Sequence, residues 1–67
     1  MTFGERLKQL RKEKGIKSQI ELASLTGLSN AGISYIEQDS RQPCLYTLRL
    51  IAEAFNMSLS KLLEGVE

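Results

Sequence analysis

The feature that most constrains this chain is an abrupt break between two helical segments at Gly27 and Leu28. Apolar positions recur at helical spacing as far as Thr26, and directly after the break Ser29 is a residue type that caps helix N-termini. Glycine adopts the left-handed conformation that ends a helix sharply. Two helices joined within about three residues must cross steeply, so this stretch predicts a helix-turn-helix unit.

Two capping-box spacings mark the starts of the first two predicted helices. Thr2 and Glu5 open a helix that Gly15 ends, and Ser18 and Glu21 repeat the spacing at the start of the next helix. In each box the hydroxyl accepts a hydrogen bond from the amide of the acidic residue, whose carboxylate accepts one from the cap amide. Both helices therefore have a defined first residue.

Three further helices complete the expected fold. The third is expected from Ser29 to about Gln38 and is followed by a polar loop from Asp39 to Pro43. The fourth ends near Asn56, which suits its C-terminal cap, and Ser58 can cap a short fifth helix. The inward stripe of the fourth helix is expected to be Leu45, Leu48, Ile51, Ala52 and Phe55. Five short helices without a strand predict an all-α architecture.

Length and composition exclude several classes of protein. A chain of 67 residues makes one domain, residues 1–67, with no second domain to sense a small molecule. One cysteine, Cys44, and no histidine leave neither a disulfide framework nor a metal site, and we expect no cofactor. Without a histidine or a glycine-rich phosphate loop, an enzyme is not expected. No long apolar run or leader is present, so we expect a cytoplasmic protein without a membrane partner.

Charge is distributed unevenly, although the net charge is only +1. Residues 1–17 carry six basic and two acidic side chains, a net charge of +4, whereas residues 18–67 have a net charge of −3. Such a basic cluster is either an ordinary solvated helix face or the electrostatic footprint of a nucleic-acid binder. Charge alone leaves both interpretations open.

A long ordered pattern of residue types runs through the predicted helices. It reads Gln19-x-Glu21-Leu22-Ala23-x-x-Thr26-Gly27-Leu28-Ser29-x-x-x-Ile33-Ser34-x-Ile36-Glu37, then Arg41-x-Pro43, then Leu45-x-Thr47-Leu48-x-x-Ile51-Ala52. This pattern resembles the Cro and lambda-repressor-like family of helix-turn-helix regulators, also called XRE-type, from about Phe3 to Leu63. The resemblance implies a compact five-helix domain whose third helix enters the major groove of double-stranded operator DNA.

The resemblance also assigns contacts with base edges to one face of the third helix. The residues expected there are Asn30, Ala31, Ser34 and Tyr35. Asparagine can bind adenine through two hydrogen bonds, serine can bind either kind of base edge, and an alanine methyl can contact a thymine methyl. Tyr35 either contacts DNA or packs as a partly buried aromatic residue.

Phosphate contacts and one structural ion pair follow from the same resemblance. Gln19, Ser29 and Arg41 match positions that contact the DNA backbone, and a helix N-terminus favours an anion beside Gln19. Arg41 is alternatively an idle loop residue. Arg11 and Glu37 match an ion pair that links the first helix to the third.

Several residues depart from the family pattern. Asp39 stands where relatives often have glycine, so its backbone is either strained or forms a different turn. Cys44 replaces the usual capping Ser or Thr, which predicts a weaker start to the fourth helix. Gly32 either lets DNA approach closely or is merely tolerated. Ile20 and Leu25 are either a small protein-contact patch or tolerated exposed residues.

Two classes of function remain open from the sequence. The first is a transcriptional regulator, most simply a repressor, that binds an operator as a homodimer, with the fourth and fifth helices as the dimer surface by resemblance. The second is a protein-interaction module or antitoxin-type partner-binding protein that keeps the fold without reading DNA. Neither class requires a small-molecule ligand.

Overall fold

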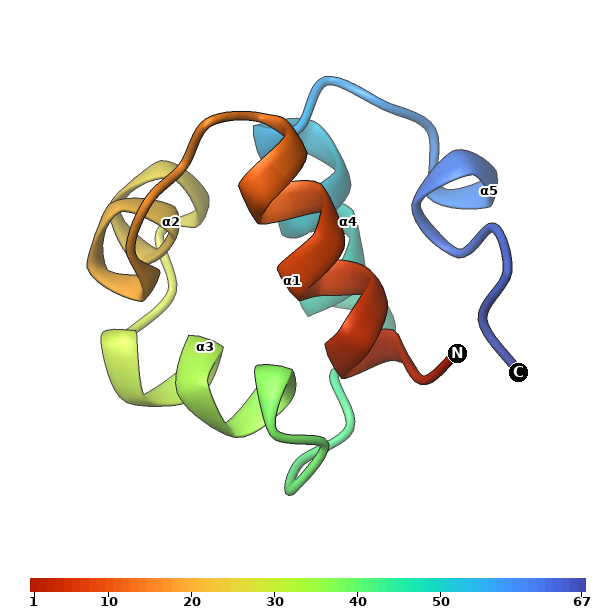
Figure 1. Ribbon diagram of the computed structural model, residues 1–67, viewed down its shortest axis with the longest axis horizontal. Helices are drawn as coiled ribbons and strands as arrows, with labels where there is room; N and C mark the ends of the chain where they lie inside the picture. Colours follow the sequence, from red (N-terminus) through yellow and green to blue (C-terminus); the bar gives the residue numbers. More distant parts are fainter.

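A computed structural model describes all 67 residues and contains five helices and no strand (Figure 1). The helices are α1 (Phe3–Glu13), α2 (Gln19–Thr26), α3 (Asn30–Glu37), α4 (Leu45–Ala54) and α5 (Leu59–Leu62). The predicted all-α architecture is confirmed, with helix boundaries close to those expected. None of the helices combines the length and the apolar character needed to cross a membrane.

The helix starts agree with the predicted capping except for half of the second box. Thr2 Oγ1 accepts from the amide of Glu5, 3.2 Å away, and the Thr2 amide donates to Glu5 Oε1 at 2.8 Å. Ser18 Oγ accepts from the Glu21 amide at 3.1 Å, but Glu21 Oε2 accepts from the amide of Lys17 at 3.2 Å, not from that of Ser18. The predicted hydrogen bond from the Ser18 amide to the Glu21 carboxylate is therefore wrong. The chain is extended at Ser18, so successive amides point to opposite sides and only the earlier one faces the carboxylate.

One apolar cluster joins the helices. Its buried members are Leu7, Leu10, Ile16, Leu22, Ala23, Ile33, Ile36, Ile51, Ala52, Phe55 and Leu62. Each large member contributes roughly 1.5–3 kcal/mol relative to exposure. Leu45 was expected in this core, but it is 54 % exposed. Helical side chains lean toward the N-terminus, so the first residue of α4 points past the end of the core.

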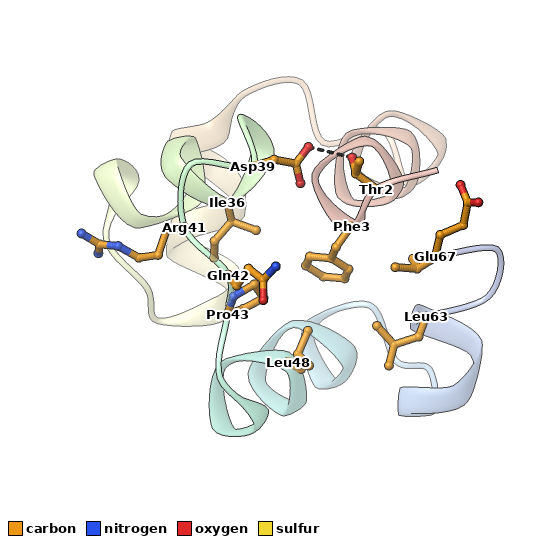
Figure 2. A pocket seen from close by; sticks show the side chains of 11 residues that line it. Thr2, Phe3, Ile36, Asp39, Arg41, Gln42, Pro43, Leu48, Leu63 and Glu67 are labelled. Atoms are coloured by element: carbon orange, nitrogen blue, oxygen red, sulfur yellow. Dashed lines mark hydrogen bonds between the residues drawn. The ribbon is translucent and has the colours of Figure 1, made fainter.

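The start of α1 lies against the end of α3. A Cβ atom on Gly4 would come within 2.6 Å of the Glu37 carbonyl oxygen and 2.7 Å of that of Ile36, so only glycine permits this approach. Asp39 follows α3 in the left-handed region with φ 60°. Of the two alternatives predicted for this residue, a strained backbone or a different turn, the structure has the strained backbone. Its carboxylate accepts from the Gly4 amide at 2.9 Å and from Thr2 Oγ1 at 2.7 Å, as Figure 2 shows for Thr2. Side-chain hydrogen bonds thus offset the backbone strain at this joint.

Arg6 attaches α5 to α1, a contact that helical periodicity and capping patterns do not predict. Its side chain is buried, with Nε donating to the carbonyl oxygen of Leu62 at 3.0 Å and Nη2 to that of Lys61 at 2.8 Å. A cation at a helix C-terminus complements the carbonyl groups left free there. Arg11 is also buried, so two of the six basic residues of the amino-terminal cluster serve the interior. The exposed members are Lys8, Lys12, Lys14 and Lys17.

Candidate nucleic-acid interface

The turn between α2 and α3 is fixed by short-range hydrogen bonds. Gly27 adopts φ 80°, and its amide donates to the carbonyl oxygen of Ala23 at 2.9 Å. Thr26 Oγ1 is buried and accepts from the Leu28 amide at 3.2 Å, while Ser29 Oγ accepts from the Gly32 amide at 2.9 Å. The helix-turn-helix unit is confirmed. Figure 1 shows this turn at the left of the molecule, with α3 along the lower edge.

One side of α3 is left uncovered by the rest of the fold. Asn30 and Ala31 are exposed, and Tyr35 is 44 % exposed. Ser34 is half-buried, and its Oγ accepts from Gln38 Nε2 at 3.0 Å, which leaves the hydroxyl hydrogen free to donate. The four residues predicted to read bases occupy positions i, i+1, i+4 and i+5, so together they cover a continuous arc of about 140° on one side of the helix. That face carries no charged side chain.

Gln19 is tied to the ion pair beneath it. Arg11 Nε donates to Glu37 Oε2 at 2.7 Å and Arg11 Nη2 to Oε1 at 3.2 Å, and the Glu37 side chain is fully buried. Gln19 Nε2 donates to Glu37 Oε1 at 3.1 Å. Because an ionised carboxylate only accepts hydrogen bonds, this contact fixes which end of the Gln19 amide faces inward. The second Nε2 hydrogen remains available at the start of α2.

A hollow of about 330 Å³ separates the start of α3 from the start of α4. Among the residues that line it are Ser29, Gly32, Arg41, Cys44 and Thr47. Cys44 makes no capping bond to α4, so the weaker start predicted for this helix is confirmed. The first amides of α4 therefore have no side-chain cap, an arrangement suited to an anion, whereas the Gly32 amide of α3 is bonded to Ser29 Oγ.

The thiol of Cys44 is exposed at the rim of this hollow. Its Sγ lies 3.4 Å from Thr47 Oγ1, and hydrogen bonding, chiefly to the Thr47 side chain, lowers the pKa of the thiol below its ordinary value. Hydrogen bonds that favour the charged form act in this direction. The thiolate is therefore more populated at neutral pH than in an unperturbed cysteine.

The exposed apolar residues of α2 do not form one patch. Ile20 is 68 % exposed and Leu25 is 55 % exposed. Residues five positions apart on an α-helix point about 140° away from each other. The exposed polar residues Ser24 and Glu21 occupy the arc between them, which favours tolerated exposure over a shared apolar contact surface.

Comparisons with known proteins agree with this geometry. A family model described as helix-turn-helix matches residues 7–62. The chain belongs to this family. It is 40 % identical over 58 residues to the HTH-type transcriptional regulator PuuR of Escherichia coli, covering 87 % of the chain and 31 % of PuuR. It is 38 % identical over 60 residues to the immunity repressor protein of Bacillus phage phi105, covering 90 % of the chain and 41 % of that repressor. The chain thus spans about a third of the length of the first curated relative it matches.

Solved structures of one repressor share the fold. The DNA-binding domain of the P22 c2 repressor in solution has a TM-score of 0.87 and 32 % identity, covering 97 % of this chain and 84 % of that domain. The P22 c2 repressor in complex with a synthetic operator has a TM-score of 0.83 and 31 % identity, covering 97 % of each chain. The lambda-repressor-like fold and the predicted resemblance to Cro-type and repressor-type regulators are confirmed.

Proposed function

We propose that this helix-turn-helix protein is a repressor that reads a specific DNA operator by inserting α3 into the major groove. The observation that carries the proposal is the uncovered face of α3, where Asn30, Ala31, Ser34 and Tyr35 present hydrogen-bonding and apolar groups to one side. The operator complex of the P22 c2 repressor, which has the same fold, supports this use of the domain.

Different residues supply the affinity for DNA and the discrimination between DNA sequences. The uncharged face of α3 suits base edges, which carry sequence information. Backbone attraction is assigned to Gln19, Ser29, Arg41 and the helix N-termini around the 330 Å³ hollow. Gln19 supports this role because Glu37 holds its amide with one hydrogen still free. With a net charge of only +1, we expect modest affinity from a single copy.

A second copy of the chain would raise the affinity for DNA above that of a single copy. A homodimer on a two-fold operator would contact half-sites about 34 Å apart. We assign the dimer surface to the region of α4 and α5, and Figure 1 shows α5 on the opposite side of the molecule from the turn between α2 and α3. A DNA-binding protein works in the compartment that holds the DNA, which we propose is the cytoplasm.

Selection from a random DNA pool, followed by fluorescence anisotropy with the selected and random duplexes, tests the proposal. Asn30→Ala is expected to reduce the preference for the selected site about fivefold or more, because it removes a base contact. Gln19→Ala is expected to weaken binding to both duplexes by a similar factor. Ser24→Ala, an exposed change on α2 away from the proposed contacts and the proposed dimer surface, is the matched control and leaves both affinities unchanged.

Two outcomes would contradict the proposal. Equal losses on both duplexes in Asn30→Ala would exclude base readout by this residue. Failure to select any sequence, or binding that does not weaken as salt rises, would favour the protein-interaction module, because phosphate contacts are steeply salt-dependent. The symmetry of the selected site and sedimentation of the complex would test the homodimer.

A further inference from the structure

Tyr35 contacts the loop after α3 through both its side chain and its main chain. The guanidinium carbon of Arg41 lies 4.9 Å from the centroid of the Tyr35 ring. The carbonyl oxygen of Tyr35 accepts from the amide of Ser40 at 3.0 Å and from Ser40 Oγ at 3.2 Å. A residue of the predicted base-reading face therefore holds the segment that carries a predicted phosphate contact.

Arg41 has no other side-chain partner in the structure. Its guanidinium makes no hydrogen bond and no ion pair, whereas the buried Arg6 and Arg11 make several. Figure 2 shows a second pocket, which Phe3 and Leu63 line, and the Arg41 side chain points out of it. The ring of Tyr35 is thus the one group that orients this cation.

The preceding residues make the loop a firm base for this contact. Asp39 is bonded to Gly4 and Thr2 at the start of α1, and Ser40 is bonded to α3. The main chain on the α3 side of Arg41 is therefore fixed, and the remaining freedom lies in the long side chain itself. The cation–π contact with the Tyr35 ring restricts that freedom before any ligand arrives.

We propose that Tyr35 is the positioning residue for Arg41, holding its guanidinium for a phosphodiester oxygen of the DNA backbone. This inference rests on the proposed DNA-binding function. It adds that the contact between Tyr35 and Arg41 links the reading of bases to the binding of the DNA backbone. A cation–π contact uses none of the five N–H donors of the guanidinium in a hydrogen bond, so they stay free to bind phosphate oxygens. One side chain of the recognition helix then serves both kinds of contact.

The test compares Tyr35→Leu and Tyr35→Phe by anisotropy with a random-sequence duplex over a range of salt concentrations. Tyr35→Leu removes the ring and is expected to weaken random-DNA binding about two- to fivefold, the range of one exposed cation–π contact. It is also expected to reduce the salt dependence toward that of Arg41→Gln, which loses up to about 0.9 in the slope of log K against log salt. Tyr35→Phe keeps the ring and both values.

A double variant and a matched control make the readout specific. In an Arg41→Gln background, Tyr35→Leu is expected to cause no further loss on random DNA. Leu25→Ala removes an exposed apolar side chain of α2, outside both the face of α3 and the proposed dimer surface, and is expected to change neither affinity nor slope. The Ser40 bonds go to the main chain of Tyr35, so they survive every one of these substitutions.

Three results would overturn the inference. The first is a Tyr35→Leu variant that loses operator preference but keeps its random-DNA affinity and salt slope, since Tyr35 would then contact bases alone. The second is additive losses from Tyr35→Leu and Arg41→Gln, since the two residues would then act independently. The third is wild-type protein that shows no salt-dependent DNA binding, which would refute the proposed function itself.

Discussion

Substitutions of Asp39 separate the strain of its backbone from the hydrogen bonds of its side chain. The residue has φ 60°, and a left-handed conformation costs an L-residue roughly 1–2 kcal/mol. Its carboxylate accepts from Gly4 at 2.9 Å and from Thr2 at 2.7 Å. Losing acceptors of this kind at a helix start costs about 0.5–2 kcal/mol, and losing the anion there about 0.3–1 kcal/mol more.

These magnitudes predict an order of stability. Asp39→Ala keeps the strain and loses the bonds, so we expect a loss of about 1–3 kcal/mol. Asp39→Gly loses the same bonds but recovers roughly 1 kcal/mol of strain, and Asp39→Asn keeps one acceptor without the charge. The expected order is Asp, Asn, Gly, Ala. In a domain of this size each kcal/mol lowers the melting temperature by about 4–8 °C.

Thermal and urea unfolding followed by far-UV circular dichroism would measure this order. Asn56→Gly is the matched control, because Asn56 has φ 55° and its side chain makes no hydrogen bond. That variant reports relief of strain alone. If Asp39→Gly raised stability as much as Asn56→Gly does, the bonds of Asp39 to the start of α1 would contribute nothing and the reasoning would be refuted.

Three other substitutions test the joints of the fold. Glu37→Ala leaves the buried Arg11 without its partner and should cost about 3–5 kcal/mol in urea unfolding; a loss below about 1 kcal/mol would contradict this. Gly4→Ala forces α1 from α3 and should cost at least about 1–3 kcal/mol by the same assay, whereas wild-type stability would contradict the close approach. Cys44→Ser offers a better cap to the Thr47 amide and should add about 0.5–1 kcal/mol. In the wild type, alkylation of Cys44 should reach half its maximal rate at a pH below the ordinary thiol pKa, since the thiolate forms earlier; an ordinary midpoint would contradict the lowered pKa.

Local patterns predict the helices because caps and helical periodicity act within about four residues, whereas the face of α3 and the Arg11–Glu37 ion pair follow only from the family resemblance. The contacts that were missed join distant parts of the chain. Asp39 meets Gly4 across 35 positions, and Arg6 meets Leu62 across 56. Neither periodicity nor capping rules carry information at that range, so Arg6 was counted with the exposed basic residues. Leu45 was misplaced for a related reason, since its spacing is correct but the core ends before it.

The two ends of α3 have different roles, and this difference determines which substitutions can alter DNA preference without loss of stability. Glu37, at its last turn, is buried against Arg11, and Asp39 just beyond it is bonded to α1. At the first turn, Asn30 and Ala31 are exposed, and the cap at Ser29 does not involve their side chains. A helix anchored at one end presents its other end without ordering on binding, so little affinity is lost to conformational entropy. Substitutions at the first turn should therefore alter the preferred operator at nearly constant stability, whereas substitutions of Glu37 should lose fold and binding together.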